Sequence, residues 1–207
     1  MRKLALSLVA AAVLAFGVES EPAGAPPTDV EAGLAGVLQK DGVRVKDGAK
    51  NVMEVWFRQT APKGEATSES NVSLTHVPHG SLIGVARFPE AGKDRRGQTV
   101  KPGLYTLRLS FFPPDGNHQG VSEQRDFLVL SPVSVDKDVN AAPAFEALMD
   151  MSRKGSGTPH PLVLSAWKAD EAKFKAGVAK EGEHDYVLQH KIGELPLAVI
   201  VSGTVEH

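Results

Sequence analysis

The sequence predicts an all-β protein, a β-sandwich of about eight or nine strands with one short helix. Hydrophobic side chains recur at every second position over most of the chain, which is the period of a strand with two unlike faces. Clusters of Gly, Pro and Asp separate these segments and mark turns. One stretch alone has helical spacing, so strands do not alternate with helices as they would around a parallel sheet.

The N-terminal residues have the layout of a secretory signal peptide. Two basic residues precede an apolar run over residues 4–18, and a polar, Pro-rich sequence follows. The run is short for a membrane-spanning helix, which needs roughly 20 apolar residues. We therefore expect residues 1–20 to be a signal peptide, cleaved after Gly17 or after Ser20, because small residues precede both bonds. A retained N-terminal anchor is the alternative.

The remainder of the chain is expected to be one domain. Residues 21–35 are rich in Pro and Ala and are predicted to be a flexible lead-in, and residues 36–207 are predicted to form a single β-sandwich domain. A second membrane-spanning run is not predicted, so a periplasmic or secreted protein is expected. The chain has no cysteine, which excludes a cysteine-linked lipid and disulfides, so stability must come from apolar burial or a ligand.

Two kinds of strand are predicted. Residues 53–57 put hydrophobic side chains on one face and Trp56 on the other, and residues 105–111 alternate in the same way. The polar face of the second segment, which we expect to meet solvent, consists of Thr106, Arg108 and Ser110. The remaining predicted strands are residues 43–45, 82–88, 127–130, 162–167, 174–178, 184–192 and 197–201. Several of these are apolar on both faces and suit the centre of a sheet.

One helix is predicted over residues 141–152. Asn140 is an acceptable N-cap, Pro143 fits the first turn, and three hydrophobic residues form a stripe. The spacing between the predicted strands is irregular and includes long insertions. Since closed barrels tend to have more even spacing, the sequence favours a sandwich.

A resemblance supports this fold class. Residues 101–108 read Lys-Pro-Gly-Leu-Tyr-Thr-Leu-Arg and resemble the PGxYTLR-type start of a strand in transthyretin-like and Ig-like exported modules. More broadly, residues 96–108, 115–120, 125–128 and 156–161 together are similar to a group of uncharacterised exported bacterial proteins. The resemblance covers about the middle third of the chain. It implies an Ig-like or transthyretin-like β-sandwich and supplies no catalytic residue.

The charge balance argues against a nucleic-acid partner. The chain has 23 basic and 25 acidic residues, a formal net charge of −2, whereas nucleic-acid affinity needs a concentrated basic surface. The densest basic segment is residues 93–96, Lys-Asp-Arg-Arg. Because it is short, contains an acid and is flanked by glycines, we expect it to be a solvated loop.

Four histidines in predicted loops or before strands are candidate ligands for zinc or copper, namely His76, His79, His118 and His160. If residues 82–88 and 102–112 are antiparallel neighbours, His79 and His118 lie at the same end of the sheet. His160 joins them if the connection after residue 131 returns the chain to that end. The alternative is that all four are ordinary polar loop residues, since Pro78 prevents a helical pairing of the first two.

Two other sites are considered. Asp115, His118 and Asp126 could form the acid–base set of a hydrolase, although no nucleophile motif accompanies them. Trp56 lies on the polar side of its strand, where an exposed indole could bind a sugar or an apolar ligand. A covering helix or a second sheet would bury it instead.

The sequence therefore favours a non-catalytic exported module that binds or assembles with an unknown protein, glycan or small molecule of the cell envelope. A histidine-loop metal-binding protein is the first alternative and a hydrolase is the second. No cofactor is expected, apart from zinc or copper under the first alternative.

Overall fold

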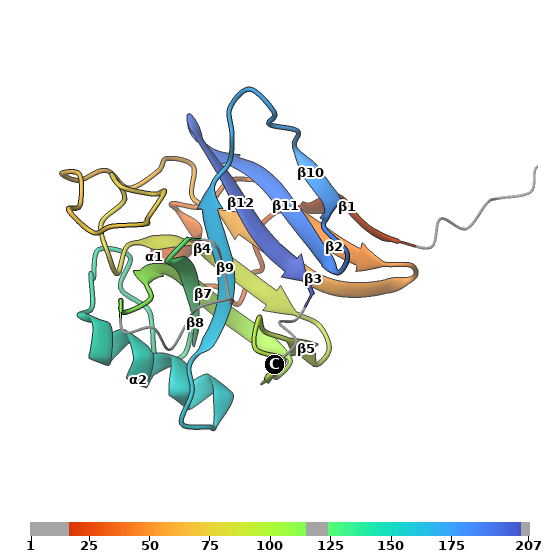
Figure 1. The fold of residues 1–207 in the computed structure, drawn as a ribbon. Coiled ribbons are helices and arrows are strands. Elements are labelled where there is room, and N and C mark those ends of the chain that lie inside the picture. Colours follow the sequence, from red (N-terminus) through yellow and green to blue (C-terminus); the bar gives the residue numbers. More distant parts are fainter. Residues whose placement is uncertain (1–16, 115–123, 204–207) are drawn as a thin grey trace, which may run out of the picture.

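The computed structural model describes residues 17–114 and 124–203, and the chain is all-β as the sequence predicts (Figure 1). In this part of the chain the strands are β1 (Val18–Gly24), β2 (Gly42–Asp47), β3 (Lys50–Phe57), β4 (Leu82–Phe88), β5 (Gly92–Lys93), β6 (Thr99–Val100), β7 (Gly103–Phe111), β8 (Asp126–Pro132), β9 (Leu162–Lys168), β10 (Gly177–Glu181), β11 (Asp185–Ile192) and β12 (Leu195–Ser202). The helices are α1 (Ala32–Ala35) and α2 (Phe145–Ser156).

Ten of these strands form one antiparallel sheet that is nearly closed. The strand order is β1-β2-β3-β4-β7-β8-β9-β12-β11-β10, and β5 and β6 form a separate hairpin. The two edge strands, β1 and β10, contact each other. At this seam the backbone N–H of Val178 donates a hydrogen bond to Oγ of Ser20 at 3.1 Å. The antiparallel pairing expected between residues 82–88 and 102–112 is confirmed, with Ala86 of β4 opposite Tyr105 of β7.

The concave side of the sheet holds the main core. Its buried residues from β3 and β7 are those that the alternation assigns to one face: Met53, Val55, Phe57, Tyr105, Leu107, Leu109 and Phe111. Leu74 and Val77, from the connection between β3 and β4, join the same core. Asp126 holds this connection, because its carboxylate accepts hydrogen bonds from the backbone N–H groups of Ser73 and Leu74 at 2.8 and 2.9 Å.

The convex side is also covered, and this explains why several strands are apolar on both faces. Helix α2 packs Leu148 and Met149 against Phe127, Val129 and Val163 of β8 and β9. A second cluster places Leu34 of α1 over β3 and β4. Gly157 ends α2 because its left-handed conformation, with a φ of 68°, turns the chain out of the helix, while its backbone N–H still donates to the Arg153 carbonyl.

The polar face of β7 does not meet solvent, contrary to the sequence prediction. Thr106, Arg108 and Ser110 are all fully buried. The segment between β8 and α2 supplies the partner, since Asp136 accepts hydrogen bonds from both Thr106 and Arg108. The alternation correctly predicted which side chains of β7 share a face. The polar face is buried because a segment that follows β8 in the chain packs over it.

Other expectations need correction. The Ig-like or transthyretin-like sandwich of eight or nine strands is not confirmed, because one continuous sheet of ten strands is present. The expected flexible lead-in over residues 21–35 instead contains most of β1 and all of α1. The helix expected over residues 141–152 is found four residues later. Residues 1–16 of the expected signal peptide lie outside the described residues.

Candidate functional site

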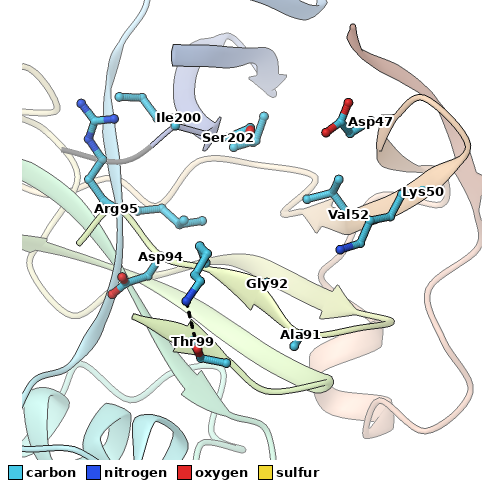
Figure 2. A pocket seen from close by; sticks show the side chains of 14 residues that line it. Asp47, Lys50, Val52, Ala91, Gly92, Asp94, Arg95, Thr99, Ile200 and Ser202 are labelled. Atoms are coloured by element: carbon cyan, nitrogen blue, oxygen red, sulfur yellow. Dashed lines mark hydrogen bonds between the residues drawn. The ribbon is translucent and has the colours of Figure 1, made fainter. Parts of the chain in front are cut away.

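A cavity of about 500 Å³ lies at one end of the nearly closed sheet (Figure 2). Strand β2 ends here, β3 begins, β12 ends, and the β5–β6 hairpin crosses beside them. Figure 2 shows Asp47, Lys50 and Val52 on one side of the space and Arg95 and Ile200 on the other. We call this cavity the mouth.

The floor of the mouth is apolar. Leu164 and Val201 belong to the main core and are almost fully buried, and Val52 packs against that core. Each of these side chains comes from a strand whose inward face is hydrophobic, so the core surface continues into the mouth. An apolar part of a ligand placed here would be removed from water, which stabilises binding by roughly 25 cal/mol for each Å² buried.

Two lysines bring positive charge to the mouth. Nζ of Lys93 donates a hydrogen bond to Oγ1 of Thr99 at 3.2 Å, shown by the dashed line in Figure 2. Nζ of Lys50 lies 3.7 Å from Glu90, but both side chains are more than half exposed, and such pairs contribute little. The carboxylate of Asp47 is also part of the lining. The ammonium groups can therefore turn to an anion at small cost.

Asp94 lines the mouth but is committed to the protein. It is 1% exposed, and its carboxylate accepts hydrogen bonds from the backbone N–H groups of Arg96, Gln98 and Val163. The side-chain amide of Gln98 adds a fourth at 3.0 Å. Burial raises the pKa of the Asp94 carboxyl, although these hydrogen bonds act in the opposite direction. Its role is to hold the β5–β6 hairpin against β9.

Arg95 is similarly engaged. Its guanidinium makes a two-pronged contact with the carboxylate of Asp185 at the start of β11, with distances of 2.5 and 3.0 Å. This geometry is the strongest form of an arginine–carboxylate pair. Its backbone N–H also donates to the Val163 carbonyl at 3.0 Å. The solvated loop predicted for residues 93–96 is therefore wrong for its two middle residues, which anchor one wall of the mouth.

The mouth has the features of a binding site more than those of a catalytic one. None of its described lining residues is a histidine or a cysteine. Its one buried carboxylate, Asp94, has its oxygens occupied by four donors. An apolar floor beside exposed ammonium groups suits a small molecule that has an apolar body and an anionic group.

The described histidines among the predicted metal ligands are not brought together. His76 and His160 are exposed, whereas His79 is half-buried between the rings of Phe111 and Phe145. His79 lines a cavity of about 360 Å³ and His160 a different one of about 200 Å³. Among the described residues, no group of three or more His, Cys, Asp or Glu is placed to hold a metal ion. His118 lies outside the described residues.

The hydrolase alternative gains one contact but no usable nucleophile. Nε2 of His79 lies 3.1 Å from Oγ of Ser110, which is the kind of pair that activates a serine. Ser110 is fully buried, so a substrate could not reach its hydroxyl. Burial lowers the pKa of His79. Of the predicted acid–base set, Asp126 anchors the connection over the core, while Asp115 and His118 lie outside the described residues.

Trp56 is not an exposed platform. It is 1% exposed and packs with Leu34 and Leu38 in the cluster around α1. Its Nε1–H donates to the Gly24 carbonyl at 2.8 Å, so its only polar atom is satisfied within the protein. The structure has the alternative arrangement, a covered Trp56, because residues 21–35, which were expected to be flexible, fold over it.

Sequence reasoning missed the mouth because its lining comes from four distant parts of the chain. One local signal was available. In Asp94-Arg-Arg-Gly97 the acid precedes a glycine by three residues, and this spacing is typical of a turn closed by an aspartate side chain. It indicates an ordered hairpin, although nothing in the sequence places that hairpin beside β12.

No helix in the described part of the chain is both long and apolar enough to cross a membrane. Comparison with protein-family models, with curated proteins and with solved structures finds no match for this chain. Functional inference therefore depends on the residues of the mouth.

Proposed function

We propose that this chain is an exported, non-catalytic binding module that holds a small amphipathic anion in the mouth of its sheet. The observation that carries the proposal is the meeting of an apolar floor, Leu164 and Val201, with the ammonium group of Lys93. Export is supported by the basic residues and apolar run at the N-terminus.

The fit between ligand and site follows from the two parts of the mouth. The apolar body of the ligand displaces water from the floor, and its anionic group replaces Thr99 as the partner of Lys93. The cavity volume of about 500 Å³ is in the range of small-molecule sites. Lys50 lies on the other side of the space and supplies a second cation.

A matched pair of fluorescent probes tests the proposal. Anilinonaphthalene sulfonate has an apolar body and an anionic group, and N-phenylnaphthylamine has a similar body without the charge. We expect saturable binding of the sulfonate at one site, with weaker binding of the uncharged probe. Lys93→Ala should weaken sulfonate binding by about tenfold, which corresponds to about 1.4 kcal/mol for a lost charge-assisted contact. It should leave binding of the uncharged probe unchanged.

Two controls separate the mouth from other surfaces. Lys173→Ala removes a lysine whose side chain is 86% exposed and which does not line the mouth, and it should leave binding of both probes unchanged. Val52→Trp should fill the mouth and weaken both. Cooperative thermal unfolding of each variant verifies that the probes report a folded protein. The proposal fails if sulfonate binding is not saturable, or if Lys93→Ala and Lys173→Ala behave alike.

A further inference from the structure

Strand β1 begins at Val18, within the segment where the signal peptide is expected to end. Small residues at the cleaved bond are compatible with a cut after Gly17 and with a cut after Ser20. The two cuts have different structural consequences. A cut after Gly17 leaves β1 whole, and a cut after Ser20 removes its first three residues.

The residues in question pair with β2 along the edge of the sheet. Val18 lies opposite Asp47, Glu19 opposite Lys46, and Ser20 opposite Val45. Val18 also packs against the main core. A chain that began at Glu21 would lose these three pairs and expose part of β2 as a new sheet edge, which is a surface prone to pairing with other chains.

Ser20 has a second role at the seam between the two sheet edges. Its hydroxyl accepts the hydrogen bond from the backbone N–H of Val178 in β10 at 3.1 Å. Close packing accompanies this bond, because a Cβ added at Gly177 would lie 3.2 Å from the same oxygen. Removing Ser20 would leave the Val178 N–H without this acceptor, in a part-buried position where an unpaired donor is unfavourable.

We infer that the signal peptide is removed at the Gly17–Val18 bond, so that Val18 becomes the first residue of the closing strand. The inference rests on the export part of the proposed function. The reaction is a hydrolysis catalysed by an envelope peptidase. The bond between the Gly17 carbonyl carbon and the Val18 nitrogen breaks, water supplies the oxygen of a new Gly17 carboxylate, and the Val18 nitrogen becomes an ammonium group.

The register places the new ammonium group beside an acidic residue. Because Val18 is the Cα partner of Asp47, the charge created by the cut lies across the strand from a carboxylate. An α-amino group has an ordinary pKa near 8, so it is mostly charged at neutral pH. A cut after Ser20 would instead place the new ammonium at Glu21, opposite Arg44, whose guanidinium is already paired with the side chains of Glu21 and Glu54. The residue across the strand would then offer no carboxylate to the new charge.

The intact mass of the exported protein tests the inference. The full chain is produced in a bacterial host with two membranes, and the envelope fraction is analysed by mass spectrometry beside the variant Glu19→Asp. We expect a mature mass that starts at Val18, and a mass lower by one methylene group in the variant. A mass that starts at Glu21 and is the same in both proteins would overturn the inference while leaving export intact.

A second variant tests the residue before the bond. Gly17→Leu places a bulky side chain at the cleaved bond, so the mature mass should disappear and the precursor should accumulate. An unchanged mature mass in Gly17→Leu would contradict a cut at this bond. Recovery of uncleaved wild-type chain from the cytoplasm alone would overturn both this inference and the export part of the proposed function. Loss of probe binding by correctly cut protein would contradict the ligand proposal only.

Discussion

At the scale of single residues, the guanidinium of Arg108 is the most heavily bonded side chain on the outer face of β7. It is fully buried and makes a two-pronged contact with Asp136 at 2.6 and 2.8 Å. It also donates to the carbonyls of Gly80, Asp138 and Ala141. One side chain thus ties the segments before β4 and after β8 to the sheet. Since its donors are satisfied, the buried charge is tolerated.

The first prediction concerns this residue. We expect Arg108→Lys to lower the free energy of unfolding by about 3–5 kcal/mol, because an ammonium cannot reproduce the paired contact and leaves Asp136 partly uncompensated in the interior. Urea denaturation measures the change. The control is Arg153→Lys on α2, whose pair with Asp150 is exposed and should cost less than about 1 kcal/mol. Equal effects of the two substitutions would contradict the buried-pair explanation.

At this scale the alternation of the sequence predicted correctly which side chains share a face of a strand. It did not predict which of those faces are buried. The inward positions of β7 are correct, since Leu107 and Leu109 lie in the main core. Arg108 and Trp56 were assigned to the correct outer face, yet both are buried. Alternation records which residues share a face. It carries no information on whether a distant segment, here α1 or the chain around Asp136, covers that face.

At the scale of elements, the β5–β6 hairpin depends on a few specific contacts. Its two strands are two residues each, too short to be stable alone. Asp94 ties the turn of the hairpin to its own backbone and to Val163 of β9. Arg95 ties it to Asp185. The wall of the mouth is therefore ordered by its anchors and not by its own strand pairing.

The second prediction tests the principal anchor. Asp94→Ala should lower the free energy of unfolding by about 1–3 kcal/mol, because buried donors lose their acceptor. It should also speed hydrogen exchange at the Gln98 and Val163 amides and weaken sulfonate-probe binding. The control is Asp170→Ala, which removes a similar turn contact, to the Ala172 N–H, in an exposed loop. Unchanged exchange at Gln98 in Asp94→Ala would show that the hairpin is ordered by other contacts.

Element positions were predictable where the local pattern determines them. Eight of the nine strands expected from alternation and apolar runs correspond to β2, β3, β4, β7, β8, β9, β11 and β12. The ninth, expected at residues 174–178, shares only its last two residues with β10. Helix α2 begins later than predicted because Arg108 uses the carbonyls of Asp138 and Ala141, and the chain is still extended at Ala144. Strand β1 was missed because it spans the end of the expected signal peptide and the start of the expected flexible lead-in, and because it contains a proline, which suits an edge strand.

At the scale of the whole molecule, closure of the sheet brings distant segments together. The seam joins β1 to β10, and the mouth joins β3 and the hairpin to β12. Both depend on the curl of ten strands, which is a sum of small twists between neighbours. No short stretch of sequence encodes that sum. A sandwich and a nearly closed sheet have the same alternation, so the sequence predicted an all-β chain but not its closure.

The pH dependence of folding is another property of the whole molecule, because two histidines at separate places contribute with the same sign. His190 stacks on Phe57 with ring centroids 5.1 Å apart, and its Nε2 lies 2.8 Å from Oε1 of Gln39. Gln39 uses its amide donors on the carbonyls of Arg58 and Lys191, so the imidazole N–H donates to the remaining oxygen. Burial lowers the pKa of His190 and of His79.

The third prediction follows from these two shifts. In the unfolded chain each histidine has a pKa of about 6.5, and in the folded chain the pKa is lower, so the unfolded state binds protons more readily between the two values. This stabilisation is present above about pH 6.5 and is lost as the pH falls towards the folded pKa.

We expect the free energy of unfolding to decrease between about pH 7.5 and about pH 5.5, and His190→Gln to reduce that decrease. His184→Gln is the control because its side chain is 68% exposed. An unchanged pH dependence in His190→Gln would show that folding does not shift the pKa of this imidazole.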